Sequence, residues 1–409
     1  MNNKFKLMEV FGIELEYMVV DRESFNVLPI ADKLFKKVMG EFTNEVVSDR
    51  INWSNELVMH IVEFKNNKPE PVLSQLVESF QKQVRIANEA LLEWNAQLMP
   101  SAMHPWMNPD RETKVWPHEN NEIYSTYDRI FGCKGHGWSN LQSLHINISF
   151  DSDEEFHQLH SAIRFFLPLI PALSASSPFV EGQSEGFSSH RLNFYLKNQR
   201  RLPSIIGQAV PEVIHSYQQY QDLILKPMYK DIASLDIDNV LQEEWLNSRG
   251  AIPKFERGCI EIRLADVQEA PVVDLSVAQF WILVIKKFMA SQWIDMEKSE
   301  TLSAEELKAI LLLTVRDGHN AIIDNTKYLD CFGEKSPLKA SDLLQSIFKK
   351  LSYQGDEIIF KDYLQRILEK GTLTSRILKS VGQNPSREKM TSTYKKLSIC
   401  LNEGQFFET

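Results

Sequence analysis

Carboxylates, one imidazole and one guanidinium recur at every second position in three short apolar segments of the chain. They are Glu14 and Glu16 in segment 11–20, His145 in segment 144–150, and Glu261 and Arg263 in segment 259–266. A period of two is typical of a β-strand with one apolar and one polar face, because successive side chains leave opposite faces of a sheet. A fourth segment, 51–64, adds Glu56 and Glu63. These two residues cannot share a face of one unbroken strand, so either a bulge separates them or Glu56 belongs to the preceding loop.

If these segments are neighbours in one antiparallel sheet, their polar residues gather on a single face. Buried carboxylates repel each other and are costly to desolvate unless cations lie among them. Carboxylate oxygens with one imidazole suit Mg²⁺, or Mn²⁺, better than Zn²⁺, and such ions commonly hold the phosphates of a nucleotide. Arg263 beside them would bind phosphate oxygens through its planar fork. The alternative is a set of unrelated strands with solvated faces, and the repetition of one pattern argues against it.

The rest of the sequence predicts the elements that must position these residues. Apolar stripes at helical spacing predict helices over residues 30–39, 72–98, 211–232, 275–293, 336–353, 356–381 and 386–401. Segment 100–137, rich in proline, tryptophan and glycine, predicts a long ordered loop, and such loops inside compact domains are usually functional. We therefore expect an α+β fold in one domain, 1–409, with a sheet-containing core over 1–272 and a helical C-terminal layer over 273–409.

The composition is that of an ordinary globular protein of 409 residues, 43% apolar and 24% charged. The formal charge of −10 argues against a surface for nucleic acid or anionic membranes, although metal ions can still bring phosphates to an acidic site. The four cysteines include no CxxC pair, so neither a zinc site nor a disulfide framework is indicated. Without a signal-peptide pattern or a membrane-spanning apolar run, we expect a cytoplasmic protein that acts on small molecules. Formation of homo-oligomers stays open.

The motifs of several other enzyme classes are absent from the sequence. Neither GxxxxGK[ST] nor GxGxxG after a strand occurs, so no P-loop or Rossmann site is predicted. No GxSxG motif or catalytic Cys–His arrangement stands out either. The sequence therefore offers no constellation for a covalent acyl-enzyme.

A series of short motifs follows one order along the chain. In the first half these are Phe11-Gly-Ile-Glu-Leu-Glu, Glu56 with Glu63, Met103-His-Pro and Leu144-His-Ile-Asn. In the second half they are Leu173-Ser-Ala-Ser-Ser-Pro-Phe, Ser188-Ser-His-Arg, Arg249-Gly-Ala-Ile-Pro-Lys-Phe and Ile260-Glu-Ile-Arg-Leu-Ala-Asp-Val-Gln. Each motif is weak alone, but the ordered set, over about residues 11–271, resembles glutamate–cysteine ligase family 2, a family of carboxylate–amine ligases.

The resemblance implies a fold similar to the catalytic domain of glutamine synthetase, in which a curved antiparallel sheet forms a funnel with a polar concave face and helices outside. It implies ATP and Mg²⁺ in that funnel, with the metal ligands Glu14, Glu16, Glu56, Glu63, His145 and Glu261. It also implies that Arg263 binds ATP phosphates and acts in catalysis. The candidates for binding substrate carboxylates or the transferred phosphate are Arg191, as a catalytic residue, and Arg129 and Arg249, on the cofactor side. Glu181 departs from the family pattern, which leaves the acceptor amine open.

The activity that the resemblance implies is an ATP- and Mg²⁺-dependent ligation of the γ-carboxylate of glutamate to an amine, with cysteine as the expected acceptor. A carboxylate is a poor acyl donor because its leaving group would be oxide. Phosphorylation by ATP converts it into an acyl phosphate that an amine can attack, and metal ions with Arg263 would offset the charge of the moving phosphoryl group. The alternatives are a different acceptor amine, a metal-dependent hydrolase with the same acidic funnel, and a catalytically silent binding protein.

Overall fold

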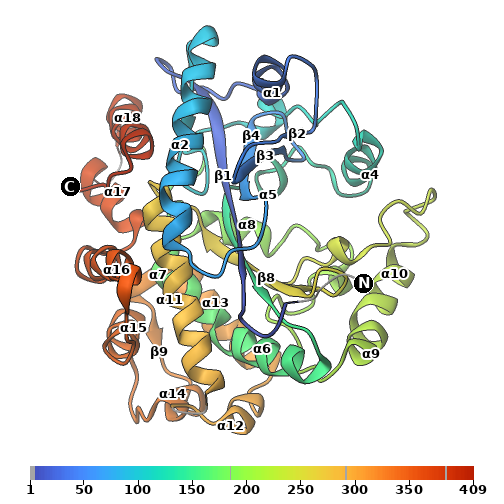
Figure 1. The fold of residues 1–409 in the computed structure, drawn as a ribbon, viewed down its shortest axis with the longest axis vertical. Helices are drawn as coiled ribbons and strands as arrows, with labels where there is room; N and C mark the ends of the chain where they lie inside the picture. Colours follow the sequence, from blue (N-terminus) through green and yellow to red (C-terminus); the bar gives the residue numbers. More distant parts are fainter. Residues whose placement is uncertain (1–4, 185, 291–292, 383–384) are drawn as a thin grey trace.

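An antiparallel sheet lies at the centre of the molecule, with helices around it (Figure 1). The computed structural model describes residues 5–184, 186–290, 293–382 and 385–409. The strands are β1 (Phe11–Asp21), β2 (Glu45–Val46), β3 (Ile51–Asn55), β4 (Ile61–Asn66), β5 (Ala96–Met99), β6 (Ser143–Ser149), β7 (Ala251–Lys254), β8 (Cys259–Asp266), β9 (Ile322–Ile323) and β10 (Leu338–Lys339). The central sheet has the order β2-β3-β4-β1-β6-β8-β7, with β5 paired to the second half of β1, and β9 pairs separately with β10.

Strand β1 brings the polar residues of its neighbours into register. Glu14 lies opposite Lys65 of β4 on one side and opposite His145 of β6 on the other. Glu16 lies opposite Glu63 of β4. Because side chains two residues apart share a face, these residues all project from the same side of the sheet.

Helices pack around the sheet. They are α1 (Ala31–Met39), α2 (Ser74–Leu91), α3 (Pro109–Glu112), α4 (Asn121–Phe131), α5 (His136–Ser139), α6 (Asp153–Phe166), α7 (Ile170–Ser174), α8 (His190–Tyr195), α9 (Tyr217–Tyr220), α10 (Lys226–Ile232), α11 (Pro271–Met289), α12 (Met296–Glu300), α13 (Ala304–Asp317), α14 (Thr326–Phe332), α15 (Ala340–Lys349), α16 (Ile358–Lys370), α17 (Leu373–Val381) and α18 (Arg387–Glu403). Ile13, Leu15 and Tyr17 of β1 are fully buried, and α2 and α11 run lengthwise along this strand (Figure 1). The predicted α+β fold with an antiparallel sheet is confirmed.

At the sheet, one predicted helix end is wrong, and the open question about Glu56 is answered. The helix predicted over 72–98 ends at Leu91, and after a turn through Asn95, whose φ of 50° is left-handed, the chain forms β5. Apolar residues at 96–99 match a helical stripe, but they are buried because they pair with β1. Segment 51–64 forms two strands, and Glu56 lies in the connection between β3 and β4.

Two further segments differ from the predictions in detail. The single helix predicted over 356–381 is two helices, α16 and α17, interrupted at Gly371. Gly371 has a φ of 90°, which glycine adopts without the strain that other residues would incur. The segment predicted as a loop, 100–137, contains the short helices α3, α4 and part of α5.

The C-terminal helices α17 and α18 pack against each other, and α18 contacts both α2 and β5. A buried ion pair joins Arg376 of α17 to Glu269, three residues beyond the end of β8. The backbone of Phe407 completes the pair, since its N–H donates to Glu269 and its carbonyl accepts from Arg376. Among the described residues, no helix is long and apolar enough to cross a membrane.

Candidate active site

Four glutamates and one histidine meet on the polar face of the sheet; we call them the acid cluster. Oxygen or nitrogen atoms of Glu14, Glu63 and His145 lie within 4.8 Å of one another, and so do oxygens of Glu16, Glu56 and Glu63. Glu63 therefore belongs to both groups. Each group combines carboxylates from different strands or loops, as the alternating pattern predicted.

Hydrogen bonds orient the side chains at the centre of the acid cluster. His145 Nδ1 lies 2.9 Å from Glu14 Oε2, and its Nε2 lies 2.9 Å from Ser143 Oγ. Glu16 Oε2 accepts hydrogen bonds from the backbone N–H and the hydroxyl of Ser143, at 2.7 and 2.8 Å. Sequence reasoning missed Ser143, although it stands two positions before His145 and therefore on the same face of β6.

Crowding of the carboxylates shifts their ionisation. Burial raises the pKa of Glu56 well above its usual value, and the charges of Glu16 and Glu63 raise it further. Burial also raises the pKa of Glu16, although His145 opposes the shift. At Glu14, the hydrogen bond from His145 and nearby lysine charges outweigh burial, and the pKa is lowered. Ionisation of all these carboxylates together is therefore unfavourable unless a further cation lies among them.

Two lysines that the sequence analysis did not single out face the acid cluster. Lys65 Nζ lies 3.2 Å from the carboxylate of Glu63. Lys254 forms an ion pair with Glu261, and Arg263 Nε lies 3.4 Å from the other oxygen of that carboxylate. Lys65 follows Glu63 by two residues, so the alternation could have revealed it. Lys254 lies on β7, a strand for which the sequence analysis had no prediction.

The donor set of the acid cluster fits Mg²⁺. Both groups contain two or more carboxylates, and one adds an imidazole. Hard oxygen ligands with at most one nitrogen are the ligands that Mg²⁺ and Mn²⁺ prefer. Of the six predicted ligands only Glu261 lies outside the two groups, because its carboxylate is paired with Lys254 and Arg263.

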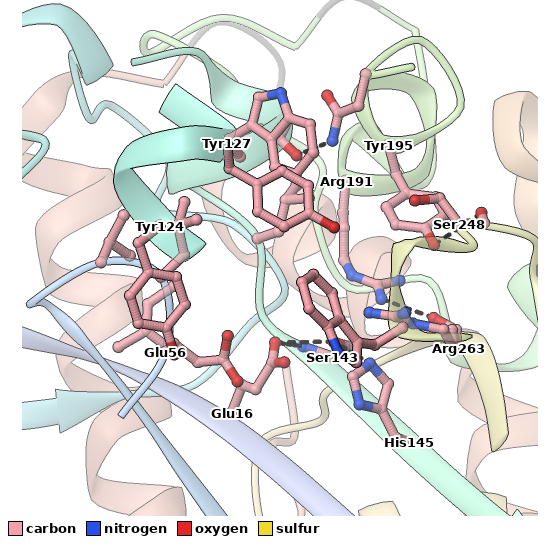
Figure 2. A pocket seen from close by; sticks show the side chains of 18 of the residues that line it. Glu16, Glu56, Tyr124, Tyr127, Ser143, His145, Arg191, Tyr195, Ser248 and Arg263 are labelled. Carbon is pink, nitrogen blue, oxygen red and sulfur yellow. Dashed lines mark hydrogen bonds between the residues drawn. The ribbon is translucent and has the colours of Figure 1, made fainter. Parts of the chain in front are cut away.

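A hollow with a volume of about 420 Å³ opens beside the acid cluster. Glu16, Glu56 and His145 line its floor, and Arg191 and Arg263 lie next to each other at one end (Figure 2). We call it the aromatic hollow, because its remaining wall is rich in rings. These rings are Tyr124, Tyr127, Trp138, Tyr195 and Trp245. The arrangement puts cations and carboxylates at one end of a cavity and apolar surface at the other.

Two rings of the aromatic wall come from the segment that was predicted to be a functional loop. Its helix α4 supplies Tyr124, whose hydroxyl accepts a hydrogen bond from Asn55 at 3.0 Å, and Tyr127. The ring of Trp138, from α5, lies 5.4 Å from that of Tyr127 between centroids. Burial and the charge of Glu56 raise the pKa of Tyr124 to about 12, so this hydroxyl stays protonated at neutral pH.

A second hollow, of about 640 Å³, lies on the other side of the acid cluster. Glu14 and Lys65 line it, together with Asn52 and Arg257. We call it the polar hollow, since it lacks the aromatic wall. Glu14 reaches the polar hollow while Glu16 reaches the aromatic one, because they belong to neighbouring positions of one strand face. The acid cluster therefore separates two cavities.

Two of the predicted arginines lie away from both hollows. Arg249 donates two hydrogen bonds of 2.8 Å to the carboxylate of Glu212 and one of 3.1 Å to the carbonyl of Ser204. Arg129 donates at 2.9 Å to the carbonyl of Leu235. Neither lines a hollow, so the geometry gives them anchoring contacts instead of a place at a ligand.

Glu181, the departure from the family pattern, also lies outside the aromatic hollow. Its side chain is mostly exposed, and its carboxylate lies 3.3 Å from Nε2 of His136 in α5. Helix α5 carries Trp138, so Glu181 reaches the aromatic wall only through this neighbouring helix.

Comparison with known proteins yields relatives over nearly the whole chain. A protein of Archaeoglobus fulgidus, named only as uncharacterized, is 32% identical over 403 residues, which are 97% of this chain and all of that protein. A glutamate–cysteine ligase of Haloquadratum walsbyi is 23% identical over 326 residues, covering 78% of this chain and 80% of its own.

Solved structures share the fold at low sequence identity. A glutamate–cysteine ligase from Francisella tularensis, crystallised with AMP, matches 98% of this chain and 90% of its own, with a TM-score of 0.61 and 14% identity. The ligase PafA, in complex with the ubiquitin-like protein Pup, matches 98% of this chain and 76% of its own, with a TM-score of 0.50 and 10% identity.

The family comparison agrees with the motifs. The pattern of the glutamate–cysteine ligase family 2 (GCS2) matches residues 10–396. This range extends the resemblance beyond residues 11–271, into the helical layer. The resemblance inferred from the motifs is thus confirmed, and the chain belongs to glutamate–cysteine ligase family 2.

Proposed function

We propose that this protein is an ATP- and Mg²⁺-dependent ligase that joins the γ-carboxylate of glutamate to an amine, with cysteine as the first acceptor to test. The observation that carries the proposal is the acid cluster between two hollows. A ligase of this kind must bring a nucleotide and a carboxylate together at one metal-binding centre while keeping their binding sites apart. The two hollows border one carboxylate cluster and therefore satisfy that requirement.

The nucleotide belongs in the polar hollow in this proposal. Lys65 and Arg257 line it and would face the phosphates, and Glu14 connects it to the acid cluster. Mg²⁺ held by the groups of Glu14, Glu63 and His145 and of Glu16, Glu56 and Glu63 would supply charge neutralisation for those phosphates.

Glutamate and the amine belong in the aromatic hollow. Arg191 would bind the carboxylate that does not react, and Arg263 would face the γ-carboxylate and the incoming phosphoryl group. Both guanidinium groups can bind two oxygens at once, which orients them as well as neutralising their charge. The aromatic wall, with Tyr127 and Trp138, would exclude water from the acyl phosphate, which would otherwise be hydrolysed.

The reaction then follows in two displacements. An oxygen of the γ-carboxylate attacks the terminal phosphorus of ATP, and the bond from that phosphorus to the bridging oxygen breaks to release ADP. The amine nitrogen next attacks the carbonyl carbon of the acyl phosphate, loses a proton, and expels inorganic phosphate. That phosphate carries away one oxygen that began on glutamate.

Labelled oxygen tests the proposal directly. Glutamate with heavy oxygen in its γ-carboxylate should pass one label to inorganic phosphate at each turnover, and hydroxylamine in place of the amine should yield γ-glutamyl hydroxamate with ADP. Label in AMP would contradict phosphoryl transfer and indicate adenylation. Turnover without nucleotide would favour the metal-dependent hydrolase. A panel of amines that begins with cysteine, scored by glutamate-dependent ADP release, tests the acceptor.

An arginine substitution tests the role given to Arg263. Arg263→Lys keeps the charge but loses the planar fork, so turnover should fall on the order of tenfold or more. Arg316→Lys is the matched control, since Arg316 pairs with Asp317 at the surface. Unchanged turnover and ATP affinity in Arg263→Lys would instead indicate a simple structural bridge to Glu261.

A further inference from the structure

Two segments, 176–177 and 189–191, converge on the carboxylate of Asp266, the last residue of β8. Its Oδ2 accepts hydrogen bonds from the backbone N–H of Ser176 at 2.9 Å and from the hydroxyl of Ser177 at 3.2 Å. Its Oδ1 accepts from the hydroxyl of Ser189 and from Nη1 of Arg191, each at 3.2 Å. Asp266 is 1% exposed. With four donors, this carboxylate is committed to holding its neighbours and does not face a ligand.

Arg191 is fixed at two of its three nitrogens. Besides the bond to Asp266, its Nη2 donates at 2.8 Å to the backbone carbonyl of Arg263. Its Nε has no hydrogen-bond partner among the residues that the structure describes, and the side chain lines the aromatic hollow. A guanidinium has five N–H donors in a rigid fork, so the two bonds determine the direction of the remaining donors.

Asp266 also keeps Arg191 away from the acid cluster. The charge of Arg191 opposes the raised pKa of Glu16, so the guanidinium lies within electrostatic reach of the cluster. Without the bond to Asp266, the guanidinium would be free to turn toward the carboxylate of Glu16. The bond to Asp266 and the bond to the β8 backbone prevent that rotation.

These contacts set the separation between two guanidinium groups. Nη2 of Arg191 is hydrogen-bonded to the backbone carbonyl of Arg263, which is the other arginine of the aromatic hollow. Figure 2 shows the two side chains next to each other at the end of the aromatic hollow. Nε of Arg263 lies 3.4 Å from the carboxylate of Glu261 on the same strand, so both guanidinium groups are anchored to β8.

We propose that Asp266 is a positioning residue that makes the enzyme discriminate between dicarboxylate donors of different length. It does so by holding Arg191 at a fixed separation from Arg263. The inference rests on the proposed function, in which Arg191 binds the unreactive carboxylate and Arg263 faces the reactive one. In this proposal glutamate places one carboxylate at each fork, whereas aspartate, shorter by one methylene, would leave its second carboxylate short of the phosphoryl group.

The test compares donors in the hydroxylamine assay. The ratio of kcat/KM for glutamate to that for aspartate should fall about tenfold or more in Asp266→Asn, because a misplacement of about 1 Å or one methylene has effects of this size. Arg191→Lys, which keeps the charge but loses both bonds, should lower the same ratio. It serves as the second variant if Asp266→Asn does not fold.

A matched control separates positioning from general damage. Asp274, a second fully buried aspartate, accepts hydrogen bonds from Gln268 and Tyr17 and has no contact with Arg191. Asp274→Asn should leave the donor ratio unchanged. An unchanged ratio in both Asp266→Asn and Arg191→Lys, with both donors slowed equally, would overturn the inference. Absence of glutamyl hydroxamate with the unmodified protein would instead contradict the proposed function itself.

Discussion

Two buried groups of charges in this molecule are built in opposite ways. At the C-terminal end, Glu269 accepts from both Nη atoms of Arg376 and from the backbone of Phe407, and the ring centroid of Phe406 lies 4.0 Å from the guanidinium carbon. In the acid cluster, by contrast, the pKa of Glu56 is raised well above its usual value by burial and by neighbouring carboxylates. The first group is neutralised by the chain, whereas we propose that the second is neutralised by bound metal ions.

The difference separates a structural role from a functional one. A buried ion pair with every donor matched resists change, since removal of either partner leaves an unpaired charge. Crowded carboxylates cost stability in the metal-free protein and persist only where something binds them. Burial alone therefore does not identify a site, whereas burial combined with uncompensated charge does.

The largest expected effect is at the structural pair. Arg376→Met leaves Glu269 buried without a cation, and we expect the free energy of unfolding to fall by about 3–5 kcal/mol. Denaturant unfolding in EDTA measures it. Arg316→Met is the control, because Arg316 is paired with Asp317 at the surface and such pairs contribute about 0–1 kcal/mol. A loss at Arg376 no larger than at Arg316 would remove the contrast between the two groups.

The second effect is on activity and leaves the fold intact. Glu16→Gln keeps the shape of the side chain but removes a charge of the acid cluster, and we expect turnover to fall on the order of a hundredfold, as when one electrostatic contact to a transition state is lost. Its melting temperature in EDTA should not fall, because the lost charge was uncompensated. Exposed Glu23→Gln serves as the control. Full activity in Glu16→Gln would exclude Glu16 as a ligand.

The smallest effect is a gain of stability that depends on pH. The folded pKa of Glu56 is raised, so its contribution is favourable below the unfolded value of 4.5 and is lost as the pH rises. Glu56→Gln should therefore stabilise the metal-free protein at neutral pH, where ionisation of Glu56 favours the unfolded chain. The gain should shrink toward pH 4.5 and when Mg²⁺ is added. If Glu56→Gln and the unmodified protein had equal melting temperatures at every pH from 4.5 to 8 in EDTA, the crowding argument would be contradicted.

Much of the sheet and the acid cluster could be predicted, because strand alternation is a local property. Glu14 and Glu16 had to share a face of β1 once the strand was recognised, and His145 had to share a face of β6. The order of motifs supplied the family. The end of the helix predicted over 72–98 could not be predicted in the same way. The apolar residues of Ala96-Gln-Leu-Met fit the helical period and the strand period equally, and only pairing with β1 makes this segment a strand.

The roles of single cations were harder to predict than those of the carboxylates. Arg249 and Arg263 look alike in sequence, each lying in a motif of the family. Their surroundings differ because Glu212, distant in sequence, pairs with Arg249, whereas Arg263 lines the aromatic hollow. The positioning role of Asp266 could not be predicted from the sequence either, because its partners come from segments 75 to 90 residues away.

The contact of Glu269 with Arg376 and Phe407 has a consequence for protein synthesis. Its partners lie 107 and 138 residues further along the chain. While the ribosome makes those residues, the segment beyond β8 holds a carboxylate that has no cation to bury against. Domains generally fold as units and non-local contacts form late. We therefore expect the nascent chain to stay open at the β8 end until residue 407 has emerged, a period in which chaperones have access to it.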